Sequence, residues 1–103
     1  MIPSKEHARA LYFSDLTDEE AERYVEALCP QAQDSFETPV DFVPSQLKIP
    51  ATYLFCELDC ASPPSLQEKW LAEFPWMKIE RCNSGHAPFI NKPDRVIEVL
   101  EKM

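Results

Sequence analysis

The chain has 103 residues, 45% of them hydrophobic, and a formal net charge of −8 at pH 7. A chain of this length forms at most one small domain with little surplus stability. The acidic charge excludes a typical nucleic-acid binder, because such a protein needs a basic surface to displace counterions. No stretch approaches the roughly 20 apolar residues of a membrane span, and the N-terminus lacks the apolar core of a signal peptide. We therefore expect a cytoplasmic protein with neither nucleic acid nor a membrane as its partner.

The first predicted helix follows Thr17 and ends before Pro30. Thr17 and Glu20 form a capping box, in which each side chain satisfies a free backbone donor of the other residue. Apolar residues at helical spacing form one stripe, which consists of Ala21, Tyr24, Val25 and Leu28.

Residues 30–50 form a predicted irregular connector. Four of these residues are prolines, and each proline removes one backbone donor that a helix needs. The connector has too many apolar side chains for a disordered linker, so we expect them to anchor it on the rest of the domain. The expected anchors are Phe36, Phe42, Val43 and Leu47.

Residues 51–59 contain the first predicted strand. Their core, TYLFCEL, is apolar on both alternating faces, which is typical of a parallel strand covered on both sides. A helix over residues 66–74 follows, and Ser65 with Glu68 forms a second capping box at its start. Residues 76–82 form the second predicted strand. The expected buried face of the helix is Leu66, Trp70 and Phe74.

Residues 83–92 form a loop, and the last predicted helix begins at Pro93. Proline is favoured in the first turn of a helix, where Asp94 also faces the positive end of the helix dipole. Glu98 and Lys102 make a favourable i,i+4 pair. The expected buried face of this helix is Val96, Ile97, Leu100 and Met103.

The order strand, helix, strand, helix predicts a βαβα unit with a right-handed crossover. A parallel sheet of two strands leaves two edges unpaired and cannot cover its own faces. We therefore expect either additional strands from a partner chain or a larger fold of which this unit is a part.

The cysteines give little support for a metal site or a disulfide framework. Cys29, Cys56, Cys60 and Cys82 include no C-x-x-C pair, which is the spacing common in zinc sites and redox motifs. Cys56 lies in an apolar run and is most simply a small buried hydrophobic residue. We expect neither a metal ion nor a cofactor.

Two titratable residues, Asp59 and His86, follow the two predicted strands. Adjacent parallel strands would bring them to the same edge of the sheet, where open α/β sheets bind ligands. A carboxylate beside a histidine fixes the imidazole tautomer and leaves the other ring nitrogen free to take a proton from a nucleophile. Gly85 would let the loop turn sharply and approach this site closely. The alternatives are a loop histidine without a catalytic role and an aspartate that only caps the following SPPS turn. His7 is expected to be a surface residue.

The stretches IPATYLFCELDCASPPSLQEKW and KIERCNSGHAPFINKPDRVIEVL resemble the C-terminal portion of the α/β-hydrolase fold. Members of that family carry a strand ending in the acid of the triad, a helix, a short strand and a G-H-x-P-F-like loop with the catalytic histidine. The resemblance covers about residues 10–101 and is closest to the fungal and plant esterases related to methylesterases and hydroxynitrile lyases. It implies one partial α/β domain over residues 1–103, with a cap-like helical segment and connector at about 10–49. A βαβα unit that carries the acid and the base then occupies residues 50–103.

The resemblance implies an ester hydrolase in which Asp59 orients His86 as the general base. The nucleophile elbow of the family is G-x-S-x-G and its oxyanion loop is typically glycine-rich, whereas this sequence has a single glycine. Neither element is present, and Ser84 and Cys82 are poor substitutes because they lie on the histidine's own loop. We therefore expect a truncated or split hydrolase that is inactive alone and is completed by an N-terminal half.

The expected substrate of such a hydrolase is a small ester, and the esterase group it resembles is compatible with secondary metabolism. Phe13, Phe36 and Trp76 are candidates for the apolar walls of its pocket. A second possibility is a non-catalytic remnant that binds a ligand, another hydrolase-like chain or its own copy through an exposed sheet edge. A third is a gene fragment without a stable fold of its own.

Overall fold

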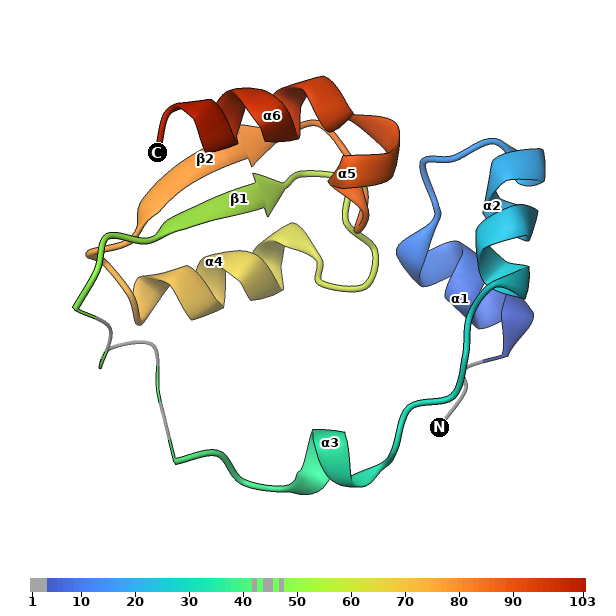
Figure 1. The fold of residues 1–103 in the computed structure, drawn as a ribbon, viewed down its shortest axis with the longest axis horizontal. Coiled ribbons are helices and arrows are strands. Elements are labelled where there is room, and N and C mark those ends of the chain that lie inside the picture. Colours follow the sequence, from blue (N-terminus) through green and yellow to red (C-terminus); the bar gives the residue numbers. More distant parts are fainter. Residues whose placement is uncertain (1–3, 42, 44–45, 47) are drawn as a thin grey trace.

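The computed structural model describes residues 4–41, 43, 46 and 48–103 of the chain. Helices and two strands alternate along this part of the chain (Figure 1). In chain order the elements are α1 (Lys5–Tyr12), α2 (Asp18–Glu26), α3 (Asp34–Glu37), β1 (Thr52–Cys56), α4 (Pro64–Ala72), β2 (Lys78–Cys82), α5 (Pro88–Asn91) and α6 (Pro93–Glu101). Among the described helices, none combines the length and the apolar character that crossing a bilayer requires.

The strands β1 and β2 form a parallel pair between two helices. Their register runs from Thr52 opposite Lys78 to Cys56 opposite Cys82. Figure 1 shows α4 on one face of this pair and α6 on the other. The predicted α/β arrangement of two short parallel strands with flanking helices is therefore confirmed. Only the last two residues of β1 are buried, so a sheet of two strands leaves much of this apolar strand half-covered.

The helices α1 and α2 lie beyond the carboxyl ends of both strands, beside α5 (Figure 1). Their shared core consists of Phe13, Leu16, Ala21 and Val25. Ile90, on α5, packs against this core together with Tyr12 and Tyr24. The guanidinium of Arg9 donates to the backbone oxygens of Phe13 and Leu16 and thereby fixes the turn between the two helices. The helical pair is thus attached to the βαβα unit next to the strand ends.

The start of α2 confirms Thr17 as the N-cap. Its hydroxyl oxygen accepts from the backbone N–H of Glu20 at 3.2 Å. The Glu20 carboxylate accepts from the Thr17 hydroxyl at 3.0 Å, and not from the backbone N–H that a full capping box would use. The earlier helix α1 was not predicted from the sequence. Its N-cap is Ser4, whose hydroxyl accepts from the backbone N–H of His7, and His7 itself is exposed as expected.

The second predicted capping box is wrong. The N-cap of α4 is Pro63 and makes no side-chain hydrogen bond, while Ser65 lies inside the helix. The physical reason is Pro64, which is pre-organised for the first helical position and has no N–H to satisfy. The predicted buried face is also shifted by one residue, or about 100° around the helix. The buried residues of α4 are Gln67 and Leu71, whereas Trp70 is exposed.

The predicted anchors of the connector are wrong where the structure describes them. Phe36 is 60% exposed and Val43 is 51% exposed, and the anchors expected at 42 and 47 lie outside the described residues. Figure 1 shows the part of the connector around α3 lying away from both the sheet and the helical pair. The described apolar side chains Phe36, Val40 and Val43 are therefore not packed on the rest of the chain.

The start of α6 at Pro93 is confirmed, and its predicted buried face is wrong except at Val96, which is half-buried. Val99 is the buried residue of this helix, while Ile97 and Leu100 are more than half exposed. Met103, just after the helix, is also exposed. The reason is the narrow sheet, since the two described strands cannot cover a wider stripe of the helix. The predicted pair of Glu98 with Lys102 is present at 3.3 Å.

Candidate catalytic site

Asp59 and His86 meet at the carboxyl ends of the two strands. The Nδ1 atom of His86 lies 3.0 Å from Oδ2 and 3.1 Å from Oδ1 of Asp59. The two loops are held side by side because the backbone N–H of Leu58 donates to the Ser84 carbonyl at 3.0 Å. The predicted meeting of the two residues is confirmed, while their catalytic role stays a prediction.

The carboxylate of Asp59 is held on several sides. Its Oδ1 accepts from the backbone N–H groups of Ala61 and Ser62 at 2.8 and 2.9 Å, and the residue is only 7% exposed. Asp59 therefore both caps the following turn and contacts His86. The contact with His86 and the capping of the turn, which the sequence left as alternatives, are both present. An ionised carboxylate only accepts hydrogen bonds, so Nδ1 of His86 must carry the proton in this contact. In a neutral ring Nε2 is then the free basic nitrogen.

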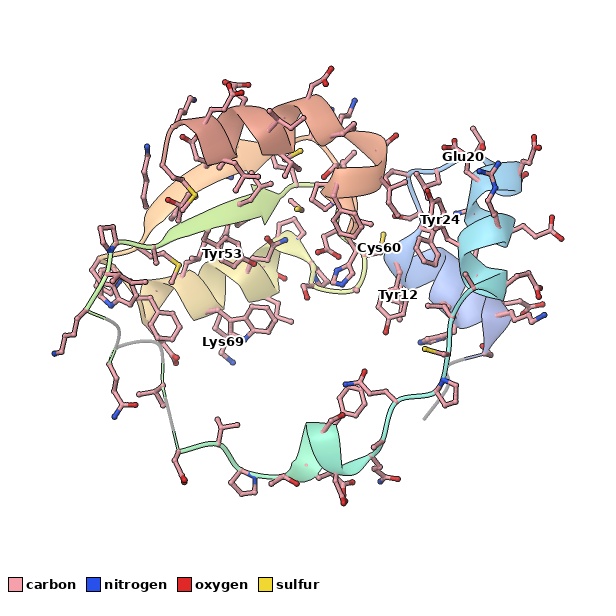
Figure 2. The ribbon with its side chains drawn as sticks, in the orientation of Figure 1. Tyr12, Glu20, Tyr24, Tyr53, Cys60 and Lys69 are labelled. Carbon is pink, nitrogen blue, oxygen red and sulfur yellow. The ribbon has the colours of Figure 1, made fainter. Side chains whose placement is uncertain are left out.

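The imidazole of His86 is open to solvent on one side and faces Tyr12 on another. Its side chain is 41% exposed, which leaves room for a reacting group. The Tyr12 ring, on α1, lies 5.3 Å from the imidazole centroid at an interplanar angle of 46°. Figure 2 shows Tyr12 at the end of α1 that lies nearer the βαβα unit. The sequence did not point to Tyr12, because no local pattern reveals a contact across this separation in the chain.

The glycine before His86 is required by a close approach. Gly85 does not have a positive φ, so the expected sharp turn does not depend on left-handed backbone. A Cβ atom at Gly85 would lie 2.7 Å from Oδ1 and 3.0 Å from Cγ of Asp15. Such distances are shorter than normal van der Waals contact, so any side chain at this position would displace Asp15 or the loop.

Asp15, in the turn between α1 and α2, was missed by the sequence analysis. Its Oδ2 accepts from the backbone N–H of Gly85 at 2.7 Å and from the side-chain amide of Asn91 at 2.9 Å. Its Oδ1 is buried and has no hydrogen-bond partner among the described residues. An aspartate just before a helix reads as an ordinary turn residue, which is why the sequence did not single it out.

Gln67, on α4, supports the loop that carries Asp59. The residue is 1% exposed, and its Nε2 donates to the carbonyls of Cys56 and Ser62 at 2.9 and 2.8 Å. Its Oε1 accepts from the backbone N–H of Cys56 and from the hydroxyl of Tyr53. Tyr53 lies on the α4 side of β1 in Figure 2. One amide thus ties together the two ends of the loop that contains Asp59.

Comparison with known proteins finds a curated protein that is similar to part of this chain. The chain is 40% identical over 55 residues to a protein named alpha/beta hydrolase nvfD from Aspergillus novofumigatus (strain IBT 16806). The similarity to this α/β hydrolase is limited to this stretch. The similar stretch covers 52% of this chain and 22% of the relative, so the chain spans about a fifth of that protein's length. No family model and no solved structure matches the chain.

The hydroxyl and thiol groups nearest His86 in the sequence are buried. Ser84 is 0% exposed and its hydroxyl donates to the carbonyl of Gly85, while Cys82 is 3% exposed. Burial also raises the pKa of the neighbouring Cys56 thiol, an effect only partly offset by a hydrogen bond with Ser84. A substrate cannot reach these groups, which agrees with the sequence-based view that they are poor nucleophiles.

The three aromatic residues suggested as pocket walls do not gather at this site. Phe13 is buried in the core of the helical pair, and Phe36 is exposed on the connector. Trp76 precedes β2 and lines a hollow of about 470 Å³ with Pro50 and Met103, at the opposite end of the strands. Within the described ranges, no group of three or more histidine, cysteine, aspartate or glutamate side chains is placed to hold a metal ion.

Proposed function

We propose that this chain supplies the acid–base part of a serine-type ester hydrolase, with His86 as the base and Asp59 as its orienting acid. The contact of Asp59 with Nδ1 of His86 carries this proposal. It lies at the carboxyl ends of adjacent parallel strands, where α/β folds place their reactive groups. The similarity to a curated α/β-hydrolase supports the same assignment.

The chemistry follows from which ring nitrogen is free. Nε2 of His86 takes the proton of a nucleophilic hydroxyl as that oxygen attacks the ester carbonyl. The imidazolium formed in this step is stabilised by the Asp59 carboxylate at 3.0 Å. The same proton then passes from Nε2 to the alkoxide that leaves, and a water molecule repeats the sequence to release the acid.

The nucleophile of this mechanism has to come from a complementary segment. The 103 residues contain one glycine, so they hold no G-x-S-x-G elbow. The free edge of β1 offers such a segment a place to pair. In the parallel ladder, Ala51 and Glu57 bond to β2, so the alternate residues Thr52 and Leu54 present their backbone groups to the other side.

Hydrolysis of p-nitrophenyl acetate tests the proposal. We expect the chain alone to be no faster than free imidazole, and we expect strong turnover after mixing with an N-terminal hydrolase half that carries the elbow. In the mixture, His86→Ala should abolish turnover and Asp59→Asn should lower it by about 10⁴-fold, because an amide can hold the wrong tautomer. Retained turnover in His86→Ala would place the base elsewhere.

A second candidate function is non-catalytic association through the exposed sheet edge and the exposed apolar face of α6. The apolar residues Ile97, Leu100 and Met103 are each more than half exposed, which favours a covered surface in an assembly. Size-exclusion chromatography that shows a defined dimer, together with no turnover in the mixture above, would favour this function over the hydrolase.

A further inference from the structure

The turn between α1 and α2 reaches the segment that carries His86. Asp15, in that turn, is separated in the sequence from Gly85 by 70 residues and from Asn91 by 76 residues, yet it binds both. One oxygen, Oδ2, makes both bonds, at 2.7 Å to the Gly85 N–H and at 2.9 Å to the Asn91 amide. The carboxylate therefore holds the segment 85–91 at its two ends.

The second oxygen of Asp15 adds a steric restraint. Oδ1 would lie 2.7 Å from a Cβ atom at Gly85, so the carboxylate lies directly against the Cα of this glycine. Ser14 contributes to the same contact, with its hydroxyl oxygen 3.3 Å from that Cβ position. The backbone of Gly85 is thus held by a hydrogen bond at its nitrogen and by close packing at its Cα.

We propose that Asp15 is a positioning residue for His86. His86 directly follows Gly85 inside the held segment, and its imidazole lies between Asp59 and the Tyr12 ring. Fixing residues 85–91 from the helical pair keeps the imidazole at the Asp59 carboxylate. The catalytic meaning of this role rests on the proposed function, whereas the positioning itself is a property of the chain alone.

The N-terminal helices α1 and α2 thus help to set the geometry of the proposed base. The sheet alone places the start of the loop, through the bond from Leu58 N–H to the Ser84 carbonyl. Beyond Ser84, the helical pair contacts the segment through Asp15, through the Tyr12 ring and through the packing of Ile90 on its core. Movement of that pair would therefore move His86 relative to Asp59.

Nuclear magnetic resonance on the chain without substrate tests the proposal. The ring-nitrogen shifts of His86 report whether Nδ1 carries the proton, and amide exchange reports the bond at Gly85. In Asp15→Ala we expect a smaller Nδ1-protonated fraction and about tenfold faster exchange of the Gly85 amide, the effect of losing one hydrogen bond. Asp15→Asn should retain most of both signals, because its amide oxygen can accept the same two bonds.

The matched control is Glu22→Ala, which removes one carboxylate from an exposed position on α2 and should leave both signals unchanged. Unchanged His86 ring shifts in folded Asp15→Ala would overturn the proposal. If that variant does not fold, Asn91→Ala decides, because it removes one of the two bonds at an exposed residue. Unchanged ring shifts in Asn91→Ala would then overturn it. A ring shift in these variants, together with no turnover of the wild-type chain mixed with the N-terminal half, would reject the proposed function and leave the positioning role intact.

Discussion

At the residue scale, the candidate site depends on side chains that hold other side chains. Asp59 is held by two backbone N–H groups, and the loop around it is tied by Gln67. The imidazole of His86 has its contacts with Asp59 and Tyr12 and is otherwise partly open. The side chains of Asp59 and His86 are thus held by contacts on their protein side, and the solvent side of the imidazole is available for a substrate.

Replacement of Gln67 by leucine should lower the free energy of unfolding by roughly 3 kcal/mol. A leucine of similar size leaves the N–H and carbonyl of Cys56 and the carbonyl of Ser62 without this partner, and unsatisfied buried groups are costly. Urea denaturation measures the change. The control is Gln33→Leu at an exposed position, where we expect a change below about 0.5 kcal/mol. Equal effects of the two variants would show that the buried amide has no special role.

At the element scale, the two helix starts where the sequence predicts a capping box should respond differently to loss of the cap hydroxyl. Thr17→Ala should destabilise the protein by about 1 kcal/mol, because the helix α2 loses its N-cap hydrogen bond. Ser65→Ala should change stability by less than about 0.5 kcal/mol, because Ser65 caps nothing and lies inside α4. Thermal and urea unfolding of both variants test this pair. A loss of stability in Ser65→Ala larger than that in Thr17→Ala would mean that Ser65 caps α4 after all.

The attachment of α6 to β2 should depend on pH. Glu80 on β2 pairs with Arg95 on α6 at 3.0 Å, with Lys78 and Lys102 nearby at 3.7 Å. The hydrogen bond from Arg95 lowers the pKa of Glu80 below its ordinary value of 4.5, partly opposed by burial. Because the folded pKa is the lower one, this stabilisation is complete above the ordinary value and is lost as the pH falls through the folded pKa.

Melting curves of wild type and Glu80→Gln at neutral and acidic pH test this linkage. We expect Glu80→Gln to melt at a lower temperature near pH 7, and we expect the difference to shrink as the pH falls through the folded pKa of Glu80 and the wild-type carboxyl takes up its proton. A difference that stays constant over this range would show that the carboxylate charge does not contribute.

Local patterns predicted the elements that depend on neighbours in the sequence. Thr17, Pro93 and the apolar run of β1 each act within a few residues, so their signals were readable. Asp59 and His86 could be paired because parallel strands bring their carboxyl ends together. Asp15 could not be found this way, because its partners lie 70 and 76 residues along the chain. The burial pattern of α6 failed for a related reason, since it depends on how many strands lie beneath the helix.

At the scale of the whole molecule, a helical pair and a βαβα unit meet at the candidate site, and one side of the unit stays apolar and exposed. Leu100→Ser should change the stability of the isolated chain by less than about 0.5 kcal/mol, because this leucine is 60% exposed. Val99→Ala, at the adjacent buried position, should cost about 1.5 kcal/mol.

Sedimentation should show that Leu100→Ser weakens binding of a complementary half or a second copy. Unweakened binding would exclude this face from the interface.

The buried amide of Gln67 also has a consequence for solubility. Gln67 is bonded to the N–H and the carbonyl of Cys56. These two backbone groups at the end of the free edge of β1 are therefore not available to pair with a strand of another molecule. Two residues, Thr52 and Leu54, are left there as a template for another backbone, too short a run to nucleate an open-ended stack of strands. Gln67, which supports the loop with Asp59, therefore also opposes the growth of fibrils from this edge.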